Sequence, residues 1–384
     1  MRVMIGADLA PTAMNFKQFE TGDMNALLGA ELLHLLSIAD YRIFNLERPL
    51  TDFENPIVKW GPCLRAPSKT IEAIKSMNVN LFTLANNHIM DQGKRGLQDT
   101  CNLLTQNGID FVGVGSNLLQ ASEPYIFEKD GIKVGIYACA EHEFSIAEEQ
   151  KEGANPFDPY ESLDHIAQLK NQCDYVIVLY HGGKEHYKYP SPLLQKCCRK
   201  IIEKGADIVL TQHSHCIGTK EEYRGKVIVY GQGNFLYAAE NKQECWDTGL
   251  LVDLQLERHG MKVVFHPLVR VELGVRLASN IEKEHILSDF EKRSVQIQDK
   301  DVLMNKYNTF AEEMFIGYES AMLGKIGGSF LFRALNKITG YRLIKKIFSG
   351  KNIVALYNAL KCEAHYELLM RGIEERLESE MGRR

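Results

Sequence analysis

The segment Ala206-Asp207-Ile208-Val209-Leu210-Thr211-Gln212-His213-Ser214-His215 joins an apolar run to a pair of histidines. Four earlier apolar runs also end in a polar side chain, at or just past the last apolar residue: Asp8, Glu47, Asn87 and His181. Strand ends are where sites form in open α/β sheets. Carboxylates, amide oxygens and imidazoles together are ligands of divalent transition metals. The pattern therefore predicts an α/β fold with a metal site at one edge of a sheet.

Strand-like and helix-like segments alternate from residue 1 to about residue 270, which is typical of a layered α/β domain. The later strands follow one another directly, with Asp130-Gly131 and His259-Gly260 as hairpin turns. A mixed sheet, or two packed sheets with outer helices, fits this order better than a purely parallel sheet. We expect strands at 2–8, 41–46, 79–85, 110–114, 125–128, 132–139, 174–181, 206–212, 226–231, 249–257 and 261–271, and helices at 24–38, 67–77, 94–107, 161–172 and 191–204.

The composition is that of an ordinary globular protein. The 384 residues include 45% hydrophobic and 25% charged residues, and the net charge of −5 gives no reason to expect a nucleic-acid partner. Nine dispersed cysteines without a CxxC pair argue against a thiolate zinc site and fit a reducing compartment. The sequence shows no signal peptide, and no stretch approaches the roughly 20 apolar residues of a membrane span. We therefore expect a cytoplasmic location.

The region 276–384 differs from residues 1–275, because it has helical periodicity and little strand signal. No acidic residue occurs between Glu319 and Glu363, whereas eight lysines and arginines lie within 325–361, interleaved with apolar residues. Two interpretations remain open. The segment is either an amphipathic helix pair docked on the core with a solvated basic face, or an interfacial segment attracted to anionic lipid or to an anionic polymer, which would make a peripheral membrane contact.

Several of the polar strand ends suggest specific chemistry. His213 and His215, two residues apart where a strand enters a turn, can reach two ions lying side by side. The amide oxygen of Asn87 can bind a cation, and the imidazole of His88 can then protonate a group bound to that ion. Asp91 either orients His88 or caps the helix at 94–107.

Asp8 and Glu47 are the carboxylates at strand ends in the first 60 residues. Carboxylates offset the charge of two dications and can bridge them, and the alternative for each is a helix or turn cap. Arg48, Lys59 and Arg65 follow the second of these strands and are candidates for binding an anionic substrate. The alternative for each of the three is a solvated surface charge.

Six blocks of the sequence combine the polar strand ends with glycines and their neighbours. The blocks are Gly6-Ala7-Asp8, Asn45-Leu46-Glu47-Arg48-Pro49-Leu50, Ala85-Asn86-Asn87-His88 with Asp91 and Gly93, His181-Gly182-Gly183 with Glu185, Gly205-Ala206-Asp207 leading to His213-Ser214-His215, and Gly231-Gln232-Gly233-Asn234-Phe235. Asn234, in the last block, is a candidate for contacting the metal loop or the substrate. In these blocks and their order the chain resembles the CapA family of poly-gamma-glutamate capsule synthesis proteins, which is related to the calcineurin-like metallophosphoesterases, over roughly residues 1–255.

The resemblance implies a four-layer α/β/β/α metallophosphoesterase-like sandwich, here with a C-terminal helical extension, and two divalent metal ions such as Mn, Zn or Fe. It implies that His88 is the general acid. Ala10 stands where the wider superfamily usually has a further histidine. The implied ligands are Asp8 and His215 for one ion, Asn87, His181 and His213 for the other, and Glu47 between the two.

These features lead to a principal hypothesis and two alternatives. The principal hypothesis is a metal-dependent hydrolase that acts on a phosphoester or on a capsule-type anionic polymer such as poly-gamma-glutamate. The second is a non-catalytic factor that binds or exports a capsule polymer on the same scaffold. The third is a nucleotide or phosphosugar phosphatase unconnected with capsule.

Overall fold

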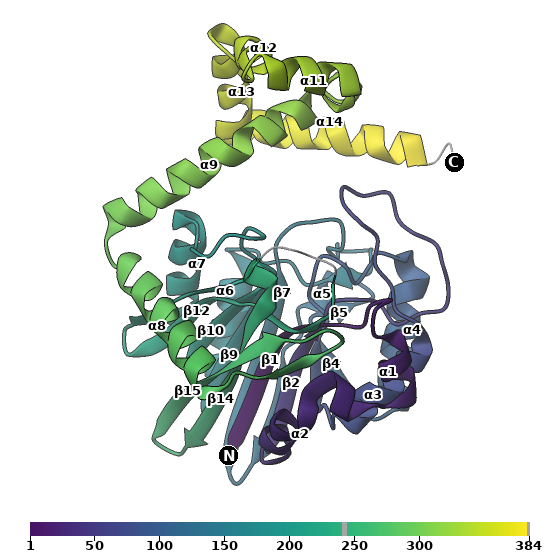
Figure 1. Cartoon of the computed structure of the whole chain (residues 1–384), viewed down its shortest axis with the longest axis vertical. Coiled ribbons are helices and arrows are strands. Elements are labelled where there is room, and N and C mark those ends of the chain that lie inside the picture. Colours follow the sequence, from purple (N-terminus) through teal and green to yellow (C-terminus); the bar gives the residue numbers. More distant parts are fainter. Residues whose placement is uncertain (240–243, 382–384) are drawn as a thin grey trace. The chain divides into compact units, whose positions relative to one another are not determined.

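The computed structural model describes residues 1–239 and 244–381, and the chain forms two compact units, Met1–Leu303 and Met304–Arg384 (Figure 1). The first unit contains the sheets and also helix α8 (Asn280–Gln296). It therefore extends beyond residue 275, where the sequence placed the change in character. The reason is that Phe290 of α8 is fully buried and packs at 5.4 Å, between ring centroids, from Phe265.

One sheet has eight strands, and its central strands β1, β2, β3 and β4 run parallel to one another. Strand β1 pairs with β14 through its first half, and then with β13 from Asp8 onward. This change of partner opens the sheet at Asp8. The strands in order are β16 (Val275–Leu277), β15 (Gly260–Arg270), β14 (Thr248–Glu257), β1 (Arg2–Ala10), β2 (Tyr41–Leu46), β3 (Leu81–Thr83) and β4 (Asp110–Val112), with β13 (Asn234–Tyr237) beside β1.

The second sheet has six strands, four of which are parallel neighbours at its centre: β12, β10, β9 and β7. Their carboxyl ends therefore lie along a single edge. The order is β11 (Ile217–Tyr223), β12 (Lys226–Gln232), β10 (Ile208–Gln212), β9 (Tyr175–His181), β7 (Ile132–Ala140) and β6 (Tyr125–Lys129), and a small separate sheet pairs β5 (Val114–Gly115) with β8 (Gly153–Ala154).

Three apolar cores define four layers. The core between the sheets contains Ile5 and Ile43 from one sheet and Ile177 from the other. A second core joins the outer face of the eight-stranded sheet to helices α1 (Phe16–Thr21), α2 (Met24–Ser37), α3 (Ile71–Ser76) and α4 (Gly93–Gln106). A third joins the six-stranded sheet to α6 (Glu161–Lys170) and α7 (Pro192–Glu203), and a short helix α5 (Leu118–Ala121) lies beside β5. The predicted α/β/β/α sandwich is confirmed.

The second unit consists of helices, as the sequence predicted for this region. Among the described residues, none of the helices has both the length and the apolar character that a membrane span requires. The helices of this part of the chain are α9 (Lys300–Met322), α10 (Lys325–Gly328), α11 (Phe330–Ile338), α12 (Arg342–Ile347), α13 (Lys351–Lys361) and α14 (Glu363–Met381).

Candidate metal centre

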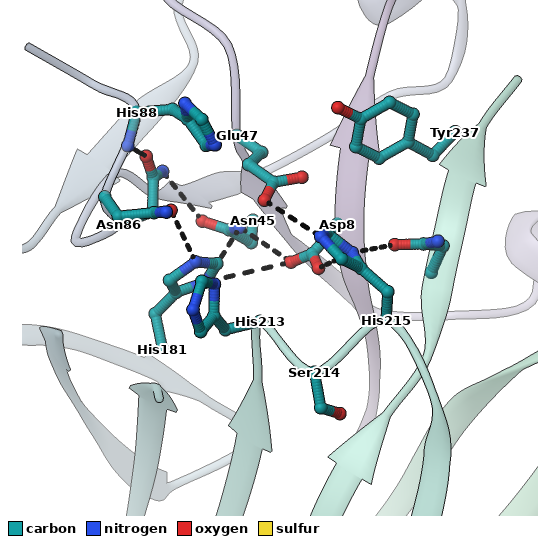
Figure 2. A network of polar contacts seen from close by, with 12 residues as sticks. Asp8, Asn45, Glu47, Asn86, His88, His181, His213, Ser214, His215 and Tyr237 are labelled. Atoms are coloured by element: carbon teal, nitrogen blue, oxygen red, sulfur yellow. Dashed lines mark hydrogen bonds and ion pairs between the residues drawn. The ribbon is translucent and has the colours of Figure 1, made fainter. Parts of the chain in front are cut away.

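The predicted ligands converge where the carboxyl edges of the two sheets meet. In the first sheet they come from β1 and from the segments that follow β2 and β3, and in the second sheet from the end of β9 and the turn after β10. Figure 2 shows five of them turned toward one another, namely Asp8, Glu47, His181, His213 and His215. All are buried: Asp8, Glu47, Asn87, His181, His213 and His215.

Two groups of potential ligand atoms share one carboxylate. Glu47, His181 and His213 form one group, and Asp8, Glu47 and His215 form the other, with the donor atoms of each group within 4.8 Å of one another. The sequence analysis expected Glu47 to lie between two sets of ligands, and in the structure Glu47 belongs to both groups. A carboxylate in such a position can bridge two cations.

Neither carboxylate oxygen of Glu47 accepts a hydrogen bond from the described residues, although the residue is only 1% exposed. The approach of His215 Nε2 to its Oε1, at 3.9 Å, is too long for a hydrogen bond. Burial and the nearby charge of Asp8 raise the pKa of Glu47 to about 8. A buried carboxylate without partners is costly to fold, and divalent cations would satisfy both of its oxygens. The residues present thus fit a metal site.

The carboxylate of Asp8 is better satisfied. Asn45 Nδ2 donates to Asp8 Oδ1 at 2.8 Å and lies 3.3 Å from His181 Nδ1. Asp8 Oδ2 has no hydrogen-bond donor among the described residues, but His215 Nδ1 lies 3.4 Å from it. Burial alone would raise the pKa of Asp8, and the neighbouring His215 lowers it. Asn45 was not predicted as a site residue. Its signal was a polar side chain within the otherwise apolar run of β2.

The histidines are in two different electrostatic states. Burial lowers the pKa of His213 to about 4 and that of His181 well below its usual value, so both rings are neutral, as a metal ligand requires. Burial would also lower the pKa of His215, but the charges of Glu47 and Asp8 raise it to about 10. A positive His215 partly offsets the two carboxylates where no cation is bound.

The turn that presents the last two histidines is strained. His213 has φ of 80° and His215 has φ of 55°, a region that residues with a β-carbon seldom occupy. Asn234 Oδ1 lies 2.8 Å from His215 Nδ1, and the ring of Trp246 packs 4.3 Å from that imidazole. Asn234 therefore orients the predicted ligand His215 through the Nδ1 atom of its ring. The sequence analysis expected Asn234 to contact the metal loop or the substrate.

His88, Asp91 and Lys59 form a buried chain of polar contacts. His88 Nδ1 lies 2.6 Å from Asp91 Oδ2, and Lys59 Nζ donates to Asp91 Oδ1 at 2.6 Å and to the carbonyl oxygen of Asn87 at 3.0 Å. Asp91 is not the cap of the next helix, because α4 begins at Gly93 without a side-chain cap. Lys59 has a 1% exposed side chain paired with Asp91 and also lines the cavity described below, so its binding of substrate stays a prediction.

Arg48 and Arg65 each contact a side chain other than the predicted ligands. The Arg48 guanidinium stacks 5.3 Å from the centre of the Tyr237 ring and donates to the Tyr237 hydroxyl at 3.3 Å. Arg65 pairs with Glu54 at 2.8 Å. Neither arginine lines the cavity that opens onto the predicted ligands, so their binding of substrate stays a prediction.

That cavity has a volume of about 500 Å³, and it reveals acidic residues that the sequence analysis did not single out as ligands or substrate contacts. Glu143 accepts from Asn87 Nδ2 at 3.2 Å, and its other oxygen lies 3.7 Å from His213 Nε2. Glu185 lines the same cavity. The available signals were the position of Glu143 just past the strand at 132–139 and of Glu185 in the His181 block. Other lining residues include Trp60, His88, Phe144, Lys184, His215, Tyr237 and Trp246.

Known proteins show similarity to this chain. The PGA biosynthesis protein CapA of Bacillus subtilis (strain 168) is 29% identical over 203 residues, which are 52% of this chain and 53% of the relative. The capsule biosynthesis protein CapA of Bacillus anthracis is 28% identical over 180 residues, 45% of this chain and 44% of the relative. The chain thus spans about half the length of the curated relatives it matches.

Solved structures show weaker similarity. A novel phosphatase from Mycoplasma pneumoniae has 16% identity and a TM-score of 0.43, covering 69% of this chain and 92% of that one. A putative 5′-nucleotidase from Staphylococcus aureus has 13% identity and a TM-score of 0.42, covering 76% and 58%. These likenesses are too distant to carry an argument. The family described as "Bacterial capsule synthesis protein PGA_cap", however, matches residues 3–239. That match covers more than half of the sequence, and the chain belongs to this family of bacterial capsule synthesis proteins.

Proposed function

We propose that this protein is a metal-dependent hydrolase of the CapA type, acting on a phosphoester or on a capsule-type anionic polymer such as poly-gamma-glutamate. The observation that carries the proposal is the position of Glu47, a buried carboxylate without hydrogen-bond donors in the described structure that is shared by two ligand groups. The polymer is suggested by the relatives, whose names refer to capsule and PGA biosynthesis.

The proposed cofactor is a pair of divalent ions, either Mn, Zn or Fe. Asp8 and His215 would hold one ion, and Asn87, His181 and His213 the other, with Glu47 between them. When bound, such ions activate water and stabilise the negative charge that develops in the transition state.

His88 is the proposed general acid. Its Nδ1 is engaged by Asp91, so Nε2 is the ring nitrogen that can donate a proton to the leaving group in the cavity that His88 lines. The Asp91 carboxylate fixes the ring, and Lys59 in turn fixes Asp91. General acids of this kind contribute about 10²–10⁴-fold to the rate.

Elemental analysis of the purified chain after reconstitution with Mn, Zn or Fe tests the metal proposal. Wild type should retain metal after desalting, His213→Ala should lose most of it, and His285→Ala, an exposed histidine on α8, should match wild type. A wild-type chain that holds no transition metal would contradict the proposal.

Turnover of an aryl phosphate and of labelled poly-gamma-glutamate then tests hydrolysis. His88→Gln should keep the wild-type metal content and lose at least about 10²-fold in kcat. Wild-type turnover in this variant would show that His88 is not the acid. Metal binding without hydrolysis of either substrate, combined with salt-sensitive polymer binding, would favour the non-catalytic alternative, which the alanine at position 10 motivates.

A further inference from the structure

The second unit buries almost none of its apolar side chains. Within residues 304–381, Ile344 is the one apolar side chain among those described that is buried, and the buried polar ones are Glu319 and Asn336. Phe330 is 89% exposed and Ile338 is 81% exposed. Apolar area left in water forgoes the main driving force of folding. This unit therefore has an exposed apolar surface, which is expected to pack against a binding partner.

Helix α11 presents its apolar face outward. Phe330, Leu331 and Ile338 lie on one arc of the helix at about 3.6 residues per turn, and Asn336 lies on the opposite side. Asn336 is the buried residue of this helix, and its Oδ1 accepts a hydrogen bond from the Ile344 backbone nitrogen at 3.2 Å. The side of α11 that carries Asn336 and the half-buried Phe332 thus faces the interior of the unit. Turning the apolar arc inward would expose Asn336.

The charge around this arc has a single sign. Helices α10 to α13 carry eight lysines and arginines, all exposed, and the sequence has no acidic residue between Glu319 and Glu363. Within the described part of the chain, none of the eight forms an ion pair. Helix α14, by contrast, carries several glutamates and has its Arg371 paired with Glu374 and Glu375. Cations without ion pairs beside exposed apolar side chains match an anionic surface with an apolar interior.

We propose that the apolar arc of α11 and the two cations beside it on the same helix dock on the anionic leaflet of a lipid membrane. The docking surface is defined by Phe330, Leu331 and Ile338, which enter the interfacial region, and by Arg333 and Lys337, which lie at one edge of the arc at helical spacing and whose long side chains reach the headgroups. The helices lie along the membrane rather than across it, which agrees with their short lengths.

Co-sedimentation of the full chain with lipid vesicles tests this proposal. The chain should bind vesicles of phosphatidylcholine mixed with phosphatidylglycerol, bind less at high salt, and bind poorly to phosphatidylcholine alone. Removing two cations with Arg333→Gln and Lys337→Gln should weaken binding about 25-fold, because each cation contributes about fivefold near an anionic surface. The control Lys262→Gln with Lys292→Gln changes the same charge on exposed residues of the first unit and should bind like wild type.

Two further double variants test the contribution of the apolar side chains to vesicle binding. Phe330→Ser with Ile338→Ser should abolish most vesicle binding, whereas Ile281→Ser with Val295→Ser, also exposed but on α8, should not. Circular dichroism and metal content should be unchanged in all variants, which separates this proposal from the proposed hydrolase.

Equal binding to neutral and anionic vesicles, or wild-type binding by the charge variant, would overturn the proposal. Binding to dissolved poly-gamma-glutamate but not to vesicles would identify a polymer site instead. A dimer that sedimentation shows to dissociate in Phe330→Ser, with no vesicle binding, would identify a second copy of the chain as the binding partner.

Discussion

Replacing Glu47 by glutamine tests the candidate metal centre through stability. Burial and the charge of Asp8 raise the pKa of Glu47 from 4.5 to about 8. At about 1.4 kcal/mol per pKa unit, the charged form costs about 5 kcal/mol of folding free energy. The buried glutamine amide would itself cost about 1–3 kcal/mol. Without metal, and above the pKa of Glu47, the variant should be more stable than wild type by about 2–4 kcal/mol.

A bound divalent cation should reverse this order. A ligand present at a thousandfold its Kd stabilises the folded state by about 4 kcal/mol. Glu47→Gln lacks the carboxylate that both ligand groups share, so it should gain much less. We therefore expect the variant to be more stable in chelator and the wild type to be more stable in saturating Mn²⁺ or Zn²⁺.

Urea unfolding followed by circular dichroism, with chelator and with metal, measures both differences. Glu221→Gln is the matched control, because Glu221 is also buried but accepts hydrogen bonds from Arg199 Nε at 2.7 Å and Gln195 Nε2 at 3.1 Å. It should lose about 1–3 kcal/mol under both conditions. If Glu47→Gln were destabilised in chelator as well, Glu47 would not be an unsatisfied carboxylate and the reasoning would be refuted.

Three further outcomes follow from the same structure. In metal-free protein, the stability advantage of Glu47→Gln over wild type should grow as pH rises from about 4.5 to about 8. The reason is that folded wild type holds the Glu47 proton more tightly than the unfolded chain does, so wild type loses stability across that window. Urea unfolding midpoints measured at several pH values test this. Asp91→Asn leaves the buried Lys59 ammonium without its counter-ion and should cost about 3–5 kcal/mol in unfolding free energy, besides lowering kcat. Gly218→Ala should cost at least about 1–3 kcal/mol, since its β-carbon would lie 1.6 Å from a β12 carbonyl oxygen, whereas Gly260→Ala, in open space, should be nearly neutral in the same urea titration.

The sandwich was predictable because its central strands are continuous apolar runs. The predicted segments 174–181 and 206–212 correspond to β9 and β10, which are buried on both faces. Strand β11 was not predicted, because it is an edge strand whose sequence Ile217-Gly218-Thr219-Lys220-Glu221-Glu222-Tyr223 is mostly polar. Strand β13 was also missed, since four residues are too few to establish a period.

The ligand cluster was predictable for a related reason, because parallel strands deliver their carboxyl ends to one edge. The residues that contact the predicted ligands and the proposed general acid could not be predicted in this way. Lys59 lies in a polar loop, and only the tertiary fold shows that its ammonium is buried against Asp91, 32 residues further along the chain. Likewise, only the tertiary fold shows that the Glu143 carboxylate lies close to His213. Local patterns describe a residue's own element, whereas these contacts join elements that are distant in sequence.

The charges of the cavity also bear on the order of events in the proposed reaction. Glu143 and Glu185 line the cavity, and Asp8 and Glu47 lie beside the His215 that lines it. Lys59 is already neutralised by a buried aspartate, and the carboxylates outnumber the two other cations of the lining, Lys184 and His215. An anionic polymer that approaches without bound cations therefore meets net repulsion at short range. Under the proposed function, cations must therefore bind before the polymer does. Metal would then determine affinity as well as rate, and affinity for an anionic substrate should rise with metal occupancy, whereas affinity for a neutral analogue should not.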